Sequence, residues 1–229
     1  LPIATAVCLG YIVYRLSLLL TSDVRVSLAA VLFYGLAPAN VVYTTVGFLD
    51  HQSHQYLWLG LLVFALTALA ADIPRRKREA GIDLNAAARA HARAPTSWIL
   101  AVVLAAAVGA SAHLWGGSPL TFIPVAAVVG LRIPVDIRHD SLPVHGNLPL
   151  LGGLTVGAGL AAVAHLSFGW HEPIAAVTPV LVAVGSLVVM IAGELWRRSS
   201  LAATRFIFVE IAVAIGGLLT YRTLRPSDI

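Results

Sequence analysis

Charged side chains are scarce in this sequence. Only 11% of its 229 residues are Asp, Glu, Lys or Arg, whereas 59% are hydrophobic. A soluble globular domain has about 25% charged and about 45–50% apolar residues. The shortage of charge therefore excludes a soluble enzyme, a nucleic-acid-binding domain and a disordered tail, and it predicts an all-α polytopic membrane protein. Cysteine is also scarce: Cys8 alone cannot form an internal disulfide, and its apolar neighbours predict a small buried side chain.

Long apolar stretches follow one another along the chain, and each spanning helix needs about 20 such residues. We therefore predict a single transmembrane domain over residues 1–229, with about eight spans. The predicted spans are 2–20, 26–46, 54–71, 97–114, 118–131, 149–167, 174–195 and 202–221. The sequence begins inside an apolar stretch without the charged start of a signal peptide, so we expect an internal part of a longer chain. Four glycines are expected to allow close helix packing: Gly152, Gly153, Gly157 and Gly159.

Basic residues divide unequally between the two sides of this arrangement. If the first helix runs from outside to inside, all Lys and Arg residues except Arg222 and Arg225 fall on the inner side. An excess of Lys and Arg marks cytoplasmic connections, so this topology places the protein in the cell membrane with a basic cytoplasmic loop at 72–96. Residues 74–78 of that loop, Pro-Arg-Arg-Lys-Arg, would be attracted to anionic lipid headgroups. Residues 83–93 could form a short surface helix, although we expect a solvated connector.

Asp50 stands out on the extracytoplasmic side, because few acidic residues fall there. It follows Gly47 and lies at or just before the start of the third predicted helix, which its carboxylate could cap. The alternative is a cation site formed with Gln52 and His54. Asp50 and Gln52 point to one side of an extended segment, whereas Asp50 and His54 share a face of a helix. Either pair gives too few ligands for a cage, so Mg²⁺ or Mn²⁺ would need further carboxylates, water or substrate phosphates.

Two segments carry a family resemblance. Residues 46–52, Val-Gly-Phe-Leu-Asp-His-Gln, resemble the Gly-Phe-x-Asp-His-His segment of archaeal oligosaccharyltransferase catalytic subunits. About sixty residues later, residues 114–117, Leu-Trp-Gly-Gly, resemble the Thr-Trp-Gly-Gly segment of the same family. Both segments stand in the family's order and on the predicted outer side. The resemblance covers residues 1–131 well, and beyond residue 149 it depends on the helix pattern alone.

This resemblance implies a GT-C membrane fold and a multi-pass glycosyltransferase for protein N-glycosylation. Members of the family transfer a glycan from a lipid-linked dolichyl phosphate or pyrophosphate donor to Asn of an Asn-x-Ser/Thr acceptor. They bind a divalent cation, Mg²⁺ or Mn²⁺, at the extracytoplasmic membrane surface. By this resemblance Asp50 is the catalytic, metal-binding aspartate, Gln52 stands where Asp, Glu or His is usual, and His54 could replace the missing ligand. Membrane lipids, the donor and the acceptor polypeptide would be the partners, and Trp115, Gly116 and Glu172 would contact substrate.

Other interpretations of these residues remain open. Gln52 is a poorer ligand than a carboxylate or imidazole, which favours a non-catalytic relative that serves as a membrane scaffold. Glu210 falls near the middle of the last predicted span, and intramembrane acids are typical of transporters. A transporter should also contain internal repeats and several intramembrane polar residues. Trp115 could be an interfacial anchor beside a flexible turn, and Glu172 could be an ordinary loop residue.

Overall fold

The computed structural model describes residues 2–36, 52–114, 122, 125–126, 129–130, 144–168 and 173–197. Every regular element within these ranges is helical, which agrees with an all-α membrane protein. Four of the described helices are long and apolar enough to cross a membrane, or five if a pair bent by 64° is counted as one span. The predicted span at 202–221 lies outside the described residues, as does most of the one at 118–131.

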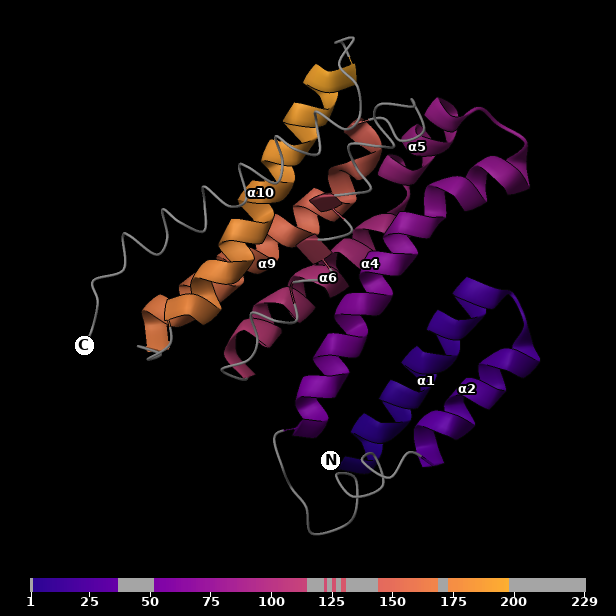
Figure 1. Cartoon of the computed structure of the whole chain (residues 1–229), viewed down its shortest axis with the longest axis vertical. Helices are drawn as coiled ribbons and strands as arrows, with labels where there is room; N and C mark the ends of the chain where they lie inside the picture. Colours follow the sequence, from indigo (N-terminus) through magenta and orange to yellow (C-terminus); the bar gives the residue numbers. More distant parts are fainter. Residues whose placement is uncertain are drawn as a thin grey trace.

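The described helices form an antiparallel hairpin followed by a larger bundle (Figure 1). The hairpin joins α1 (Pro2–Thr21) to α2 (Val24–Leu36). The other elements are α4 (Gln52–Ala80), α5 (Leu84–Arg93), α6 (Pro95–Leu114), the short 3₁₀ helix η3 (Val144–Asn147), α9 (Leu148–Phe168) and α10 (Pro173–Arg197). The α1 helix also packs against α4, the helix that follows α2 in the described chain. The α9 helix lies between α6 and α10. Apolar side chains fill the centre of the bundle, and others are exposed on its outer surface.

Basic residues gather at one end of this bundle. We call it the basic end; it contains the connection between α1 and α2, the last turns of α4, all of α5 and the last residue of α10 (Figure 1). Every Lys and Arg in the described ranges occupies a position at or near it. The opposite end holds the end of α2, the start of α4 and the end of α6. This one-sided distribution is what the positive-inside rule expects of a cytoplasmic face.

The helices α6 and α9 pack closely against each other. A Cβ atom added at Gly153 would lie 2.7 Å from the carbonyl oxygen of Ala101, and one at Gly157 would lie 2.8 Å from that of Ala105. Such distances are shorter than real Cβ contacts, so only glycine lets the two backbones approach this closely. The prediction of close packing is confirmed for these two glycines. Gly159 is different, because a Cβ there would have no neighbour within 4 Å.

The segment predicted as a solvated basic loop is mostly helical and partly buried. The third helix does not end at residue 71 but continues to Ala80, where Gly81, with a φ of 62°, ends it in a left-handed conformation. Asp83 then caps α5 by accepting a hydrogen bond of 2.8 Å from the backbone of Ala86. The turn from α5 into α6 falls at Ala94, which precedes Pro95 and is therefore pushed out of the helical conformation.

Cys8 also differs from its prediction. The side chain is exposed on α1 and not buried in the bundle. The apolar stretch around it does not distinguish a helix face that packs against protein from one that faces the membrane. Neighbouring Val7 and Tyr11 are exposed in the same way. An exposed apolar face is ordinary for a helix in contact with lipid, where there is no water to penalise it.

Candidate functional site

The cation site predicted from the sequence falls mostly outside the described part of the chain. Asp50, Trp115, Gly116 and Glu172 lie outside the described residues. Gln52 is the first residue of α4, and the backbone of His54 belongs to the same turn. The start of α4 is therefore only two residues beyond Asp50 in the sequence, close to the predicted position. A helix N-terminus carries unpaired N–H groups and a positive dipole end, which favour a nearby carboxylate.

No cation site is found elsewhere in the described ranges. Among those residues, no group of three or more His, Cys, Asp and Glu side chains lies close enough to hold a metal ion. The predicted Mg²⁺ or Mn²⁺ site depends on Asp50, which is not among them. The structure places Gln52 and His54 two residues apart in the first turn of α4, a spacing at which helical residues do not face each other. The other predicted ligands and substrate contacts lie outside the described residues.

A different polar cluster occupies the basic end, centred on Asp72 of α4. One oxygen of its carboxylate accepts a hydrogen bond of 2.6 Å from Arg75, and the other accepts bonds from Arg76 and from Nδ1 of His91 on α5, the latter at 2.7 Å. Ser97 of α6 lies 3.0 Å from the same Nδ1 atom. Asp72 and His91 expose only 8% and 2% of their side chains, so a carboxylate is buried among its partners. We call these five residues the Asp72 cluster.

The Asp72 cluster does not have the geometry of a Ser-His-Asp catalytic triad, although it contains all three residue types. In a triad the aspartate and the serine bind opposite ring nitrogens of the histidine, so that the ring can take the serine proton. Here Asp72 and Ser97 both approach Nδ1 of His91. When Nδ1 donates its proton to Asp72, it has no lone pair with which to accept a proton from Ser97. The serine is therefore not activated as a nucleophile.

The geometry of the Asp72 cluster instead holds three helices together. Asp72 belongs to α4, His91 to α5 and Ser97 to α6, so the hydrogen bonds join helices that meet at a sharp bend. The apolar side of α5 supports this contact, because Ala87 and Ala88 are fully buried against Ile73. Sequence reasoning missed this cluster. Its one signal was Asp72 followed three and four residues later by arginines, a spacing that favours ion pairs on a helix. Nothing in the sequence marked His91.

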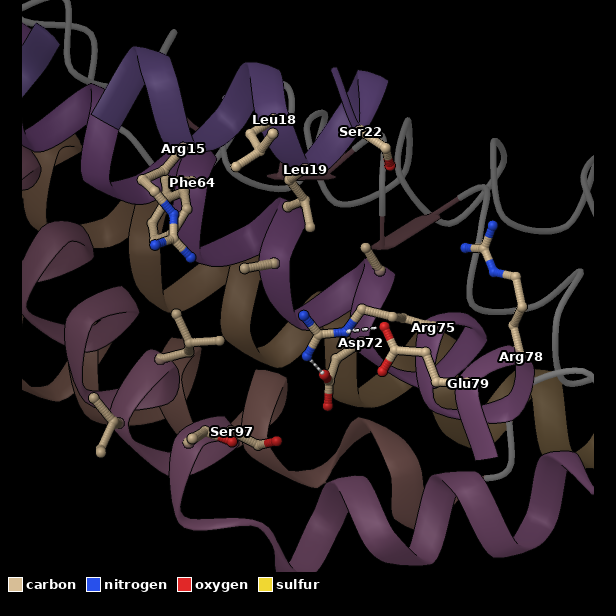
Figure 2. A pocket seen from close by; sticks show the side chains of 15 residues that line it. Arg15, Leu18, Leu19, Ser22, Phe64, Asp72, Arg75, Arg78, Glu79 and Ser97 are labelled. Carbon is tan, nitrogen blue, oxygen red and sulfur yellow. Dashed lines mark hydrogen bonds and ion pairs between the residues drawn. The ribbon is translucent and has the colours of Figure 1, made fainter. Parts of the chain in front are cut away.

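An open cavity adjoins the Asp72 cluster. It has a volume of about 810 Å³ and lies between the basic ends of α1, α4 and α6. Figure 2 shows Arg75 beside Asp72 and Glu79 in the middle of the cavity wall, with Arg15 and Arg78 on opposite sides of them. Arg75 lies 2.6 Å from Asp72 and 3.9 Å from Glu79. The remaining wall is largely apolar, with Leu18, Leu19, Phe64, Ala68, Ala71, Ile99 and Leu100.

No known protein family, curated protein or solved structure matches this chain.

Proposed function

We propose that this chain carries the active site of an oligosaccharyltransferase with a GT-C membrane fold. Such an enzyme transfers a glycan from a lipid-linked dolichyl phosphate or pyrophosphate donor to Asn of an Asn-x-Ser/Thr acceptor. The observation that supports this proposal is the segment 46–52, which resembles the catalytic motif of that family and ends on the first residue of α4. Since α4 starts at the end opposite to the basic end, the segment adjoins the side expected to face out of the cytoplasm.

The donor atoms near this helix start are chemically suited to a hard divalent cation. Asp50 supplies a carboxylate, Gln52 an amide oxygen and His54 a ring nitrogen, and Mg²⁺ and Mn²⁺ both accept such ligands. One carboxylate alone holds these ions weakly. The phosphate groups of the donor lipid, water and acidic residues outside segment 46–54 would therefore have to complete the ligand set.

The proposed reaction replaces one bond to the sugar with another. The amide nitrogen of the acceptor Asn bonds to the first carbon of the glycan, the bond from that carbon to the lipid phosphate breaks, and the amide loses a proton. Bound Mg²⁺ or Mn²⁺ would neutralise the departing phosphate. Asp50 would hold the amide N–H of the acceptor by a hydrogen bond. Because an amide is a poor nucleophile, positioning by such contacts must supply much of the rate enhancement.

Substitution of Asp50 by Asn tests this proposal against simple helix capping. Asn caps helices as well as Asp does, but it has no charge with which to hold a cation. We expect full-length protein with Asp50→Asn to transfer glycan from a lipid-linked donor to an Asn-x-Thr peptide at least about 100-fold more slowly. The matched control is Asp23→Asn. Asp23 caps α2 at the basic end by accepting a hydrogen bond of 2.7 Å from the backbone of Arg25, and its substitution should leave transfer unchanged.

Two outcomes would contradict the proposal. Transfer by the Asp50→Asn protein at the parent rate would show that Asp50 only caps α4. A parent protein that transfers no glycan in the presence of Mg²⁺ or Mn²⁺ would instead favour the non-catalytic relative that Gln52 suggests.

A further inference from the structure

The cavity at the basic end combines two chemical characters. Its inner wall is apolar, formed by side chains such as Leu18 of α1 and Phe64 of α4, whereas its rim carries Arg15, Arg75 and Arg78. Its volume of about 810 Å³ lies within the ~300–1,000 Å³ that is typical of small-molecule sites. The cavity opens beside Ile99, which is 62% exposed on the outer surface of α6. A ligand there would contact both the polar rim and the apolar surface that faces the membrane.

The rim has an excess of positive charge. Three arginines line the cavity with two acids, Asp72 and Glu79, and both acids interact with Arg75. The carboxylate of Asp72 also receives hydrogen bonds from Arg76 and His91, so it is already satisfied. These partners offset the charge of Asp72, whereas Glu79 is 67% exposed and its contact with Arg75 measures 3.9 Å.

Of the cavity residues that the structure describes, Arg15 and Arg78 are the cations available to a ligand. Within the described segments neither forms an ion pair with a carboxylate. The guanidinium of Arg15 donates a hydrogen bond of 3.3 Å to the hydroxyl of Tyr11 on the same helix. The first turn of α6 also faces the cavity through Thr96 and Ser97, and a helix N-terminus attracts negative charge. Arg15 and Arg78 therefore stand on either side of the cavity, and the start of α6 lines it as well.

We propose that this cavity binds the phosphate group of an anionic membrane lipid at the basic end of the bundle. Arg15 and Arg78 attract the phosphate from the two sides of the cavity, and the acyl chains run along the apolar wall toward Ile99. The apolar wall favours a lipid over a soluble phosphate, because a soluble ion would leave that surface unfilled. This site is separate from the proposed glycan transfer, since it lies at the opposite end of α4 from Asp50.

Lipid titration of the purified full-length protein tests the proposal. Binding of short-chain phosphatidylglycerol and of phosphatidylcholine is measured by native mass spectrometry from a neutral detergent. We expect the parent protein to prefer phosphatidylglycerol, and Arg15→Gln and Arg78→Gln each to weaken its binding about fivefold. The matched control is Arg89→Gln, because Arg89 lies on α5 at the same end but does not line the cavity. Its effect should be less than twofold.

A second variant keeps the test independent of charge. Ala68 lines the cavity from α4, so Ala68→Trp should fill the space and abolish binding of phosphatidylglycerol. Circular dichroism and a monodisperse elution profile check that each variant is folded.

Three results would overturn the proposal. The first is equal binding by the parent, Arg15→Gln and Ala68→Trp proteins. The second is an equal loss in Arg89→Gln, which would mean general attraction to the basic surface. The third is displacement of phosphatidylglycerol by an equal concentration of glycerol phosphate, which would mean that a soluble phosphate is the ligand.

Discussion

The contact between Asp72 and His91 should be the strongest polar contact that holds α5 to the bundle. Both side chains are nearly buried, and 2.7 Å separates the carboxylate from Nδ1. A hydrogen bond to a charged group contributes about 1.5–3 kcal/mol. Arg75 is 51% exposed, so its ion pair should contribute less than about 1 kcal/mol.

We therefore expect Asp72→Asn to destabilise the packing of α5 by about 2–3 kcal/mol, because it leaves His91 without its charged partner. His91→Ala should cost about 2 kcal/mol, since Asp72 keeps its arginines. The double variant should cost less than the sum of the two. The resulting coupling energy should be about 1.5–3 kcal/mol, which is measurable in a double-mutant cycle.

Cysteine labelling measures this detachment directly. Cys8 is first replaced by serine, and Ala88→Cys then places a thiol on the fully buried face of α5. A maleimide reaches that thiol only when α5 opens, so its rate reports the opening equilibrium. A change of about 2 kcal/mol corresponds to about a 30-fold faster reaction. Arg75→Gln, the exposed control, should change the rate less than about fivefold. Equal changes of the labelling rate in Asp72→Asn and Arg75→Gln, or a coupling energy below about 0.5 kcal/mol, would contradict a dominant role for the contact between Asp72 and His91.

Three further predictions concern packing, the helix bend and the cation site. Gly157→Leu should separate α6 from α9 and destabilise the bundle by at least about 1–3 kcal/mol in thermal unfolding, whereas Gly159→Leu should have almost no effect; equal effects would contradict the close contact. Pro95→Ala should let α5 and α6 straighten from their 64° bend, so spin labels placed on the two helices should move apart; an unchanged distance would assign the bend to packing alone. Gln52→Glu should raise Mn²⁺ affinity at least about tenfold, measured by electron paramagnetic resonance, and unchanged affinity would argue against a ligand at this position.

Four of the described helices could be predicted well from the sequence. Apolar stretches of the required length correspond to α1, α6, α9 and α10 with boundaries within a few residues. Composition is sufficient there because a spanning helix must be apolar along its whole length. The close contact at Gly153 and Gly157 was predictable for a related reason, since small residues four apart form a smooth strip on one helix face.

The structure of the basic end could not be predicted in the same way. Residues 72–80 are mostly polar, and their hydropathy predicted a loop. The structure shows that α4 continues to Ala80, where Gly81 ends it. Ion pairs of Asp72 with Arg75 and Arg76 stabilise this last part of the helix. The contact with His91 joins residues 19 positions apart, and a single sequence does not show which distant residues meet. The predicted cation site differs from the Asp72 cluster, because its candidate ligands are close together in the sequence and can be recognised as a motif. The function assigned to that motif stays a prediction.

The side of the membrane on which Asp50 lies provides the most direct test of the proposed extracytoplasmic cation site. Asp50→Cys and Ser22→Cys are introduced separately into full-length protein that carries Cys8→Ser, and intact cells are treated with a membrane-impermeant maleimide. Ser22 connects α1 and α2 at the basic end and serves as the reference for the opposite side. We expect the Asp50→Cys protein to be labelled in intact cells and the Ser22→Cys protein to be labelled only after permeabilisation. Labelling in the reverse pattern would place Asp50 in the cytoplasm and contradict the account.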